Sequence, residues 1–151
     1  MNSLSRTAAQ QAVIDLLDGG HEVWLDATGN SMIPLLLHKK SRVLIKKSAP
    51  YKKGSIVLYQ RESGQFVLHR ITGLSADGYT LCGDGQTIRE HGVLPCQIYG
   101  CVIGFIRKKK EYTTNSIIFR IYSFIWGKIF CVRRYPLALY RRLAAIGKDS
   151  S

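Results

Sequence analysis

Three polar side chains stand in sequence contexts that suit catalytic chemistry. Ser31 lies in ATGNSMIPLL, directly after the stretch HEVWLDAT, whose alternation is typical of a strand. A serine hydroxyl is a weak nucleophile until a neighbouring base accepts its proton. His69, in the apolar stretch FVLHRI, is the best candidate for that base. Asp84, between two glycines in CGDGQ, is the candidate for a carboxylate that reaches another strand and orients the base.

The residues around Ser31 also offer candidates for binding an oxyanion. Gly29 allows the backbone to approach a substrate carbonyl closely, and the backbone of Gly29, Asn30 and Ser31 is the candidate donor region, with the Ser31 N–H foremost. Each feature also has a structural interpretation. A lone histidine in a strand is more often structural, and Gly-Asp-Gly is more often a plain turn. Spacing alone does not select His69 among the four histidines.

Short strands are the predicted elements around these residues. Residues 5–18 carry an amphipathic pattern that predicts a helix, ended by Gly19 and Gly20. Six stretches between there and about residue 107 predict strands: EVWLDA, SRVLIKK, GSIVLYQ, QFVLHRI, GYTLCG and QIYGCVIGFIR. The third and fourth are expected to pair as a hairpin across RESG. Such closely spaced strands predict a mainly β, antiparallel and partly closed fold.

The segment after residue 107 is basic and apolar. Residues 107–151 hold eleven Lys or Arg and two acids, a net charge of +9 out of +12 for the chain. Arg120 and Lys128 interrupt the apolar runs, so none reaches the ~20 residues of a spanning helix. Pro136 is expected to divide the segment into two helices. The pattern predicts amphipathic helices lying in a membrane interface.

This segment has two alternatives to a membrane interface: packing on the β domain, and binding of nucleic acid. A helical hairpin packed on the β domain with solvated arginines is the structural alternative. Nucleic acid is disfavoured, because the residues between the cations are large aliphatics as often as stacking aromatics. We therefore expect three parts: an N-terminal helix over 1–20, a β domain over 21–110 that contains the candidate catalytic residues, and a basic, apolar, membrane-interfacial helical segment over 111–151.

Cysteine usage and the N-terminus bear on location. Four cysteines form no CxxC pair and have no histidine spaced as a co-ligand, so we interpret them as reduced thiols and predict no metal, cofactor or disulfide framework: Cys82, Cys96, Cys101 and Cys131. The first twenty residues do not show the basic and apolar regions of a signal peptide. We expect the protein to be peripheral on the cytoplasmic face of a membrane.

Read in order, these motifs resemble the serine peptidases of the signal peptidase I and SOS-repressor type, the S24/S26 group. TGNSMIPLL resembles the nucleophile box, KKGSIVLYQ the Gly-Asp-Ile-Val strand with Ser55 in place of the acid, and FVLHRI the base box. LCGDGQ resembles the Gly-Asp-Asn box without its asparagine, and IYGCVIGFIR the closing strand. The resemblance covers roughly residues 22–107. It implies the antiparallel β fold of that group.

The base box indicates a subtype. Histidine where most bacterial signal peptidases and repressors have lysine resembles the endoplasmic-reticulum, archaeal and spore-former branch. The resemblance implies Ser31 as nucleophile, His69 as general base and then acid, and Asp84 as the orienting acid, in amide hydrolysis through an acyl-enzyme. It also implies shallow substrate pockets, for which we name Met32, Ile33, Val67 and Leu68. A leader or signal segment of a peptide or protein is the expected substrate.

Two other functions remain open from the sequence. The first is a non-catalytic peptide- or membrane-binding module on the same β scaffold, which would not need Ser31 to be nucleophilic. The second is a self-cleaving repressor fragment, which ranks last. The ~20 residues ahead of the β region are too few for a helix-turn-helix unit. The lysines at 46, 47, 52 and 53 also lie before the strand that carries the base.

Overall fold

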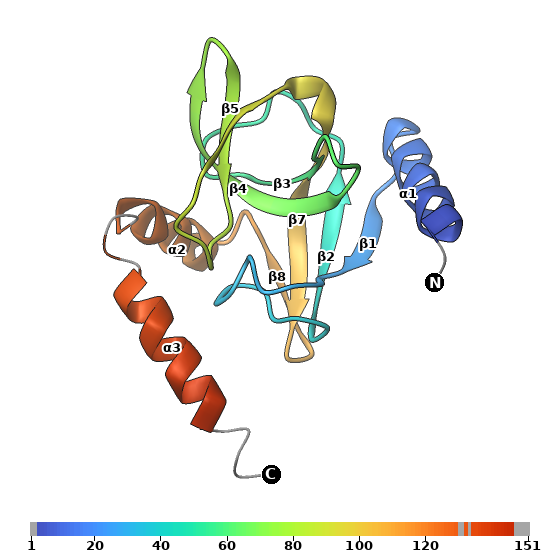
Figure 1. Cartoon of the computed structure of the whole chain (residues 1–151). Coiled ribbons are helices and arrows are strands. Elements are labelled where there is room, and N and C mark those ends of the chain that lie inside the picture. The colour runs from blue at the N-terminus through green and yellow to red at the C-terminus, as the bar shows by residue number, and fades with distance from the viewer. Residues whose placement is uncertain (1–2, 130–131, 133, 147–151) are drawn as a thin grey trace.

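A curled antiparallel sheet forms the centre of the computed structural model, which describes residues 3–129, 132 and 134–146 (Figure 1). Its strands run in the order β1-β2-β7-β3-β4-β5-β6, and β8 pairs with β7 beside that path. The bounds are β1 Val23–Asp26, β2 Ser41–Lys46, β3 Ile56–Gln60, β4 Phe66–Ser75, β5 Gly78–Cys82, β6 Glu90–Val93, β7 Ile98–Arg107 and β8 Lys110–Thr113. The predicted mainly β, antiparallel fold is confirmed.

The predicted hairpin across RESG is confirmed in its register. β3 pairs with β4 so that Val57 lies opposite His69 and Tyr59 lies opposite Val67. Because successive residues of a strand alternate between faces, His69 lies on the same face as Tyr59, diagonally across the pair. β3 is buried along nearly its whole length, since it also pairs with β7 in the middle of the sheet. The strand that carries His69 is therefore fixed by the core.

Two strands were not predicted. β6 follows the Gly-Asp-Gly stretch and pairs with β5, and β8 pairs with the end of β7. The basic run at residues 107–110 is the tip of the β7–β8 hairpin, where Lys108 and Lys109 have φ of 49° and 64°. Two consecutive positive φ values suit the twist of a tight hairpin turn. The sheet thus extends to Thr113.

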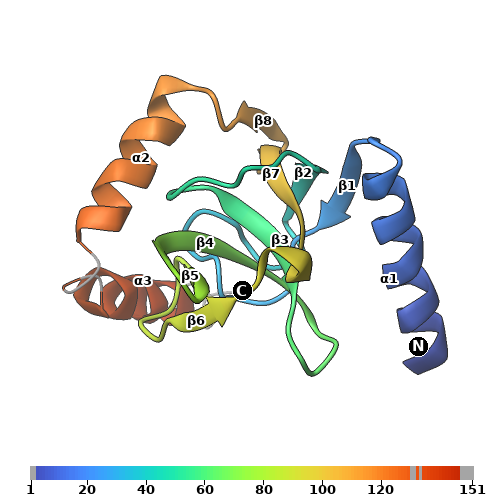
Figure 2. The same cartoon turned by 90° about the horizontal axis from the view of Figure 1, so that it is seen from above.

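Three α-helices flank the sheet, α1 on one side and the two C-terminal helices on the other (Figures 1 and 2). α1 spans Ser3–Asp18 and buries Leu17 in the core. α2 spans Ile117–Lys128 and begins at Ser116, whose hydroxyl accepts the Phe119 N–H at 3.2 Å. α3 spans Arg134–Ile146, and a single 3-10 turn covers Pro95–Gln97.

We expected Pro136 to separate the two C-terminal helices, but the break between α2 and α3 lies before it. α2 ends at Lys128 and Pro136 is the third residue of α3, in the first turn, where its missing N–H costs no helical hydrogen bond. Three residues of the predicted helical segment lie outside the described residues: Phe130, Cys131 and Arg133. Within the described ranges, no helix has both the length and the apolar character required to cross a bilayer.

Candidate active site

Ser31 and His69 line one cleft of about 670 Å³. The Ser31 loop forms one wall, β4 contributes Val67, Leu68 and His69, and the loop after β5 contributes Gly85 and Gln86. The nucleophile and base candidates are thirty-eight positions apart in the chain. The fold therefore brings both sequence-predicted residues to the same cavity, as the proposed chemistry requires.

The Ser31 loop is held by the Gly-Asp-Gly stretch through its backbone. The Gly85 N–H donates to the Ser31 carbonyl at 2.7 Å. A Cβ on Gly83 would lie 2.3 Å from that same carbonyl oxygen, and a Cβ on Gly85 would lie 2.6 Å from the Asn30 oxygen. Both glycines are thus required for close approach of two loops, in addition to any role in turning the chain.

Gly29 has the backbone conformation expected of it, with a φ of 85°. Its N–H, however, donates to Nδ1 of His38 at 2.7 Å. This hydrogen bond fixes the backbone just before the candidate nucleophile and engages an amide from the predicted oxyanion region. The Ser31 N–H remains the foremost candidate donor of that region.

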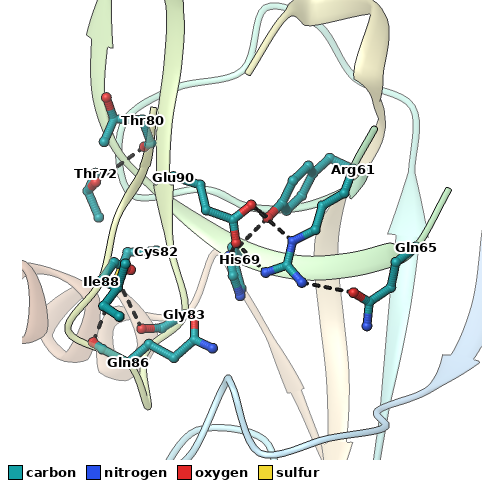
Figure 3. A network of polar contacts seen from close by, with 11 residues as sticks. Arg61, Gln65, His69, Thr72, Thr80, Cys82, Gly83, Gln86, Ile88 and Glu90 are labelled. Carbon is teal, nitrogen blue, oxygen red and sulfur yellow. Dashed lines mark hydrogen bonds and ion pairs between the residues drawn. The ribbon is translucent and has the colours of Figure 1, made fainter. Parts of the chain in front are cut away.

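The His69 ring is fully buried and is held at one nitrogen (Figure 3). Its Nδ1 lies 3.2 Å from the Tyr59 hydroxyl and 3.4 Å from Oε1 of Glu90. Tyr59 donates its only proton to Oε2 of Glu90 at 2.6 Å, so the Tyr59 oxygen can only accept from His69. Nδ1 therefore carries the proton of the neutral ring. Nε2 is left with a lone pair, as a general base requires.

Nε2 is the buried ring atom without a hydrogen-bond partner among the described residues. An unpartnered buried polar atom costs about 1–3 kcal/mol, and such costs gather at functional sites. The imidazole belongs to a residue that lines the cleft with Ser31. Nε2 thus keeps its lone pair, in a residue that lines the same cleft as Ser31.

Burial, rather than nearby charge, keeps the His69 ring neutral. Burial lowers the pKa of His69 to about 4, and it outweighs the Glu90 carboxylate, which acts in the opposite direction. Arg61 donates to Glu90 from Nε at 3.0 Å and also from Nη2. These hydrogen bonds hold the pKa of Glu90 below its usual value. Glu90 is consequently an ionised acceptor at neutral pH, ready to stabilise the Nδ1–H.

Asp84 has different partners from those we expected. Its carboxylate is fully buried and accepts a bidentate pair from Arg70, with Nε to Oδ1 and Nη2 to Oδ2 both at 2.7 Å. The Tyr122 hydroxyl adds a hydrogen bond to Oδ2 at 3.0 Å. Burial of Arg70 opposes its charge, but Asp84 outweighs that effect and raises the pKa of Arg70. The contacts at Nδ1 of His69 come instead from Tyr59 and Glu90.

Comparison with known proteins identifies the family of this domain. The family model described as Peptidase S24-like matches residues 5–103, about two thirds of the chain. The chain belongs to the Peptidase S24-like family. A search of curated proteins finds no match to it. The family is one of serine peptidases, and the matched part of this S24-like chain contains Ser31, His69 and Asp84, whereas α2 and α3 follow it.

The residues predicted to line a substrate pocket divide into two pairs. Val67 and Leu68 line the cleft of the S24-like domain beside His69. Met32 is 4% exposed and packs in the main hydrophobic cluster with Leu36 and Ile45, so it is a core residue rather than a pocket residue. Ile33 is half-buried and is not among the residues that line this cleft.

Sequence reasoning missed Tyr59, Arg61 and Glu90. Tyr59 could have been identified from the sequence, because the predicted hairpin register already places Tyr59 on the face of His69. Arg61 follows β3 and lay in the stretch taken only as a hairpin loop. Glu90 begins β6, a strand that carries no clear alternating pattern, so nothing in the sequence placed it beside the base. No cluster of three metal-ligating side chains occurs in the described part of the chain.

Proposed function

We propose that this S24-like protein is a serine endopeptidase of the signal peptidase I-like, Ser-His type, which cleaves a leader or signal segment through an acyl-enzyme. One observation carries the proposal. The neutral His69 ring is held at Nδ1 by Tyr59 and Glu90, and its unpartnered Nε2 belongs to the cleft that Ser31 lines. A base so oriented beside a hydroxyl is the arrangement of activated serine nucleophiles.

The proposed reaction has two halves. In the first, Nε2 of His69 takes the Ser31 proton as Oγ attacks the scissile carbonyl carbon, and the Ser31 N–H stabilises the oxyanion. His69 then gives that proton to the leaving amine, and the C–N bond breaks to leave an ester on Ser31. In the second half, His69 takes a proton from water, the water oxygen attacks the ester carbonyl, and Ser31 recovers its proton as the acid product leaves.

Tyr59, Glu90 and Arg61 act on this chemistry through His69. When His69 becomes charged during the reaction, the ionised Glu90 carboxylate stabilises the imidazolium from the Nδ1 side. Arg61 keeps that carboxylate ionised and fixes its orientation. These three residues are therefore positioning residues, and Glu90 takes the orienting role that the resemblance implied for Asp84.

The substrate is an extended peptide segment in this proposal. Val67 and Leu68 border the base, and Leu25 and Phe66 extend the apolar lining of the cleft. Such a lining accommodates small apolar side chains next to the cleaved bond, in keeping with the small-residue preference that the signal peptidase resemblance implies. A ribosomally made peptide with a leader is the substrate class we favour.

Labelling of the nucleophile tests this proposal. Purified wild type, Ser31→Ala and His69→Ala are treated with a serine-directed acylating probe, a penem or a fluorophosphonate, and intact mass is measured. We expect one adduct on wild type and none on either variant. An absence of adduct on folded wild-type protein would count against the peptidase and favour the binding-module alternative, since a binder needs no activated Ser31.

Membrane association is the second part of the proposal. The outward side of α2 carries exposed large apolar residues, among them Ile117, Ile118 and Phe124, which are 73%, 76% and 66% exposed. On α3, Tyr135, Leu139 and Leu143 are exposed at helical spacing. Helices with such faces and with basic residues bind the interface of a bilayer. We propose peripheral attachment through this segment, on the cytoplasmic face.

A further inference from the structure

A basic groove lies between α2 and the sheet. Its volume is about 880 Å³, and it is lined by residues of α2, of β4 and β7, and of the loop before β3. Six cationic side chains line it, and none of its described lining residues is acidic: Lys52, Lys53, Arg70, Arg89, Arg120 and Lys128. Arg70 is paired with Asp84 and therefore adds little to the charge of the groove. Such a lining favours a phosphate-bearing anion.

The groove opens beside the apolar outer side of α2. Arg120 and Phe124 are exposed residues of the helix that line the groove, and Ile121 and Ile125 are exposed at 53% and 50% on the adjoining side. The sequence holds no Asp or Glu between Glu111 and Asp149, so no acidic residue interrupts this surface. A phosphate site bordered by an apolar helix face matches one ligand chemistry, an anionic lipid at the surface of a bilayer.

The inner side of α2 is bonded to the loop that holds the candidate nucleophile. Trp126 is 8% exposed, and its Nε1–H donates to the Asp84 carbonyl at 3.0 Å. Tyr122 donates to the Asp84 carboxylate, and Arg70 donates to the Ser123 hydroxyl at 2.8 Å. The next residue along the loop, Gly85, donates to the carbonyl of Ser31.

His69 is the chain neighbour of Arg70, which α2 holds, and Ser31 is hydrogen-bonded to the chain neighbour of Asp84, which α2 also holds. Asp84 precedes Gly85, which fixes the Ser31 carbonyl, and Arg70 follows His69 in β4. The Tyr122 and Trp126 rings stack with their centroids 5.6 Å apart, and this contact restricts both side chains on the inner side of α2. A ligand that fixes α2 against the sheet would therefore also fix the Ser31 loop relative to His69.

We propose that the groove and the outer side of α2 form a binding site for anionic phospholipid, and that lipid bound there positions Ser31 through Trp126 and Asp84. The phosphate of the lipid binds among Lys53, Arg120 and their neighbours, and the acyl region covers the exposed isoleucines of α2. Trp126 is a positioning residue in this proposal. The regulatory part rests on the proposed peptidase function, whereas the lipid site does not.

The lipid site is tested by vesicle binding of the full chain. Cosedimentation is measured with vesicles of phosphatidylcholine alone and of phosphatidylcholine with phosphatidylglycerol. We expect binding to the anionic vesicles, weakened about thirtyfold in Lys53→Gln/Arg120→Gln, at about fivefold per cation near an anionic surface. The matched control Lys40→Gln/Lys110→Gln removes the same charge outside the groove and is expected to lose less than about threefold, because salt screens distant charges.

Positioning of the Ser31 loop is tested without relying on catalysis. In Ser31→Ala, hydrogen exchange at residues 83–86 is measured with and without anionic vesicles. We expect slower exchange of the Gly85 amide with vesicles, and no slowing in the same protein carrying Trp126→Phe. This variant keeps the ring packing but lacks the indole N–H. It should bind vesicles as wild type does, which distinguishes positioning from attachment.

The rate of Ser31 acylation is the second test of whether bound lipid positions Ser31. Anionic vesicles are expected to raise it about fivefold or more in wild type, within the usual range of coupling between sites. Trp126→Phe should lose the stimulation, so that its acylation rate with anionic vesicles does not exceed its own rate without them. If no protein is acylated but vesicles still slow Gly85 exchange, the peptidase proposal fails and the lipid inference stands.

Three outcomes would overturn the inference. The first is equal vesicle binding by the groove variant and its control. The second is binding that changes neither Gly85 exchange nor acylation, or that stimulates Trp126→Phe as strongly as wild type. The third is stimulation by soluble glycerol phosphate alone, or self-association through the outer side of α2 seen by sedimentation, since either would assign a different occupant to the surface.

Discussion

Replacement of Gly83 by alanine tests whether the two loops of the site are built for contact. The new Cβ would lie 2.3 Å from the Ser31 carbonyl oxygen, whereas real contacts of this kind stay beyond 3.0 Å. The neighbour is backbone, so the Ser31 loop has to move by about 0.7 Å or more. Misplacement of a reacting group by about 1 Å costs on the order of a hundredfold in rate. We expect acylation of Ser31 to slow between tenfold and a hundredfold, as orders of magnitude.

The assay separates displacement from unfolding. Overpacking of this kind costs about 1–3 kcal/mol, less than the ~5–15 kcal/mol that holds a typical domain folded. Gly83→Ala should therefore unfold cooperatively at a lower temperature and still bind vesicles. Gly73→Ala is the control, because its Cβ would meet Thr80 at an ordinary 3.6 Å. A folded Gly83→Ala that is acylated at the wild-type rate would refute the claim that this contact positions Ser31.

The remaining predictions concern the buried ionisable groups. His69 has its pKa lowered to about 4 in the fold, so the unfolded chain binds the proton first as pH falls from 6.5. We expect His69 alone to lower the unfolding free energy by roughly 3 kcal/mol between pH 6.5 and pH 4, a contribution that His69→Gln removes in urea titrations. The acid limb of kcat/KM should likewise lie well below pH 6.5. Tyr59→Phe leaves Glu90 as the partner of Nδ1, so kcat should fall about tenfold, far less than the ~10⁴-fold seen when an orienting carboxylate is lost. Asp84→Asn leaves the buried Arg70 charge unbalanced and should cost about 3–5 kcal/mol in urea unfolding, whatever its effect on acylation.

The sheet was predictable because its signals are local. All six predicted strands are present, since each combines β-branched or aromatic residues with turn residues at both ends. β6 and β8 lack such patterns, because their residues are largely exposed and their pairing partners lie elsewhere in the chain. The end of α2 was misplaced for a related reason. Proline stops a helix only beyond the first turn, and Pro136 lies within that turn of α3.

The site was predictable in part. Ser31 and His69 were selected as candidates because their neighbours are unusual for a polar residue, and both line one cleft. The partner of His69 was assigned to Asp84 because a carboxylate between glycines is conspicuous in the sequence. A conspicuous carboxylate does not reveal which cation it faces. Arg70 lies directly after His69, and its bond to Asp84 follows from the β4–β5 register, in which Arg70 lies opposite Cys82. Glu90 takes that place by a contact across twenty-one positions of chain.

The alternation of β4 explains how the C-terminal helices bear on the cleft without entering it. Consecutive side chains of a strand point to opposite faces. His69 accordingly contacts Tyr59 and Glu90, whereas Arg70 contacts Asp84 and Ser123 of α2. Because His69 and Arg70 are adjacent in the chain, a displacement of Arg70 also moves His69. Asp84 is hydrogen-bonded to Trp126, and the next residue, Gly85, is hydrogen-bonded to Ser31, so a displacement of Trp126 also moves the Ser31 loop. β4 and the loop after β5 each contact α2 through one residue and the cleft through the next. These contacts are sufficient for the proposed coupling between α2 and the cleft.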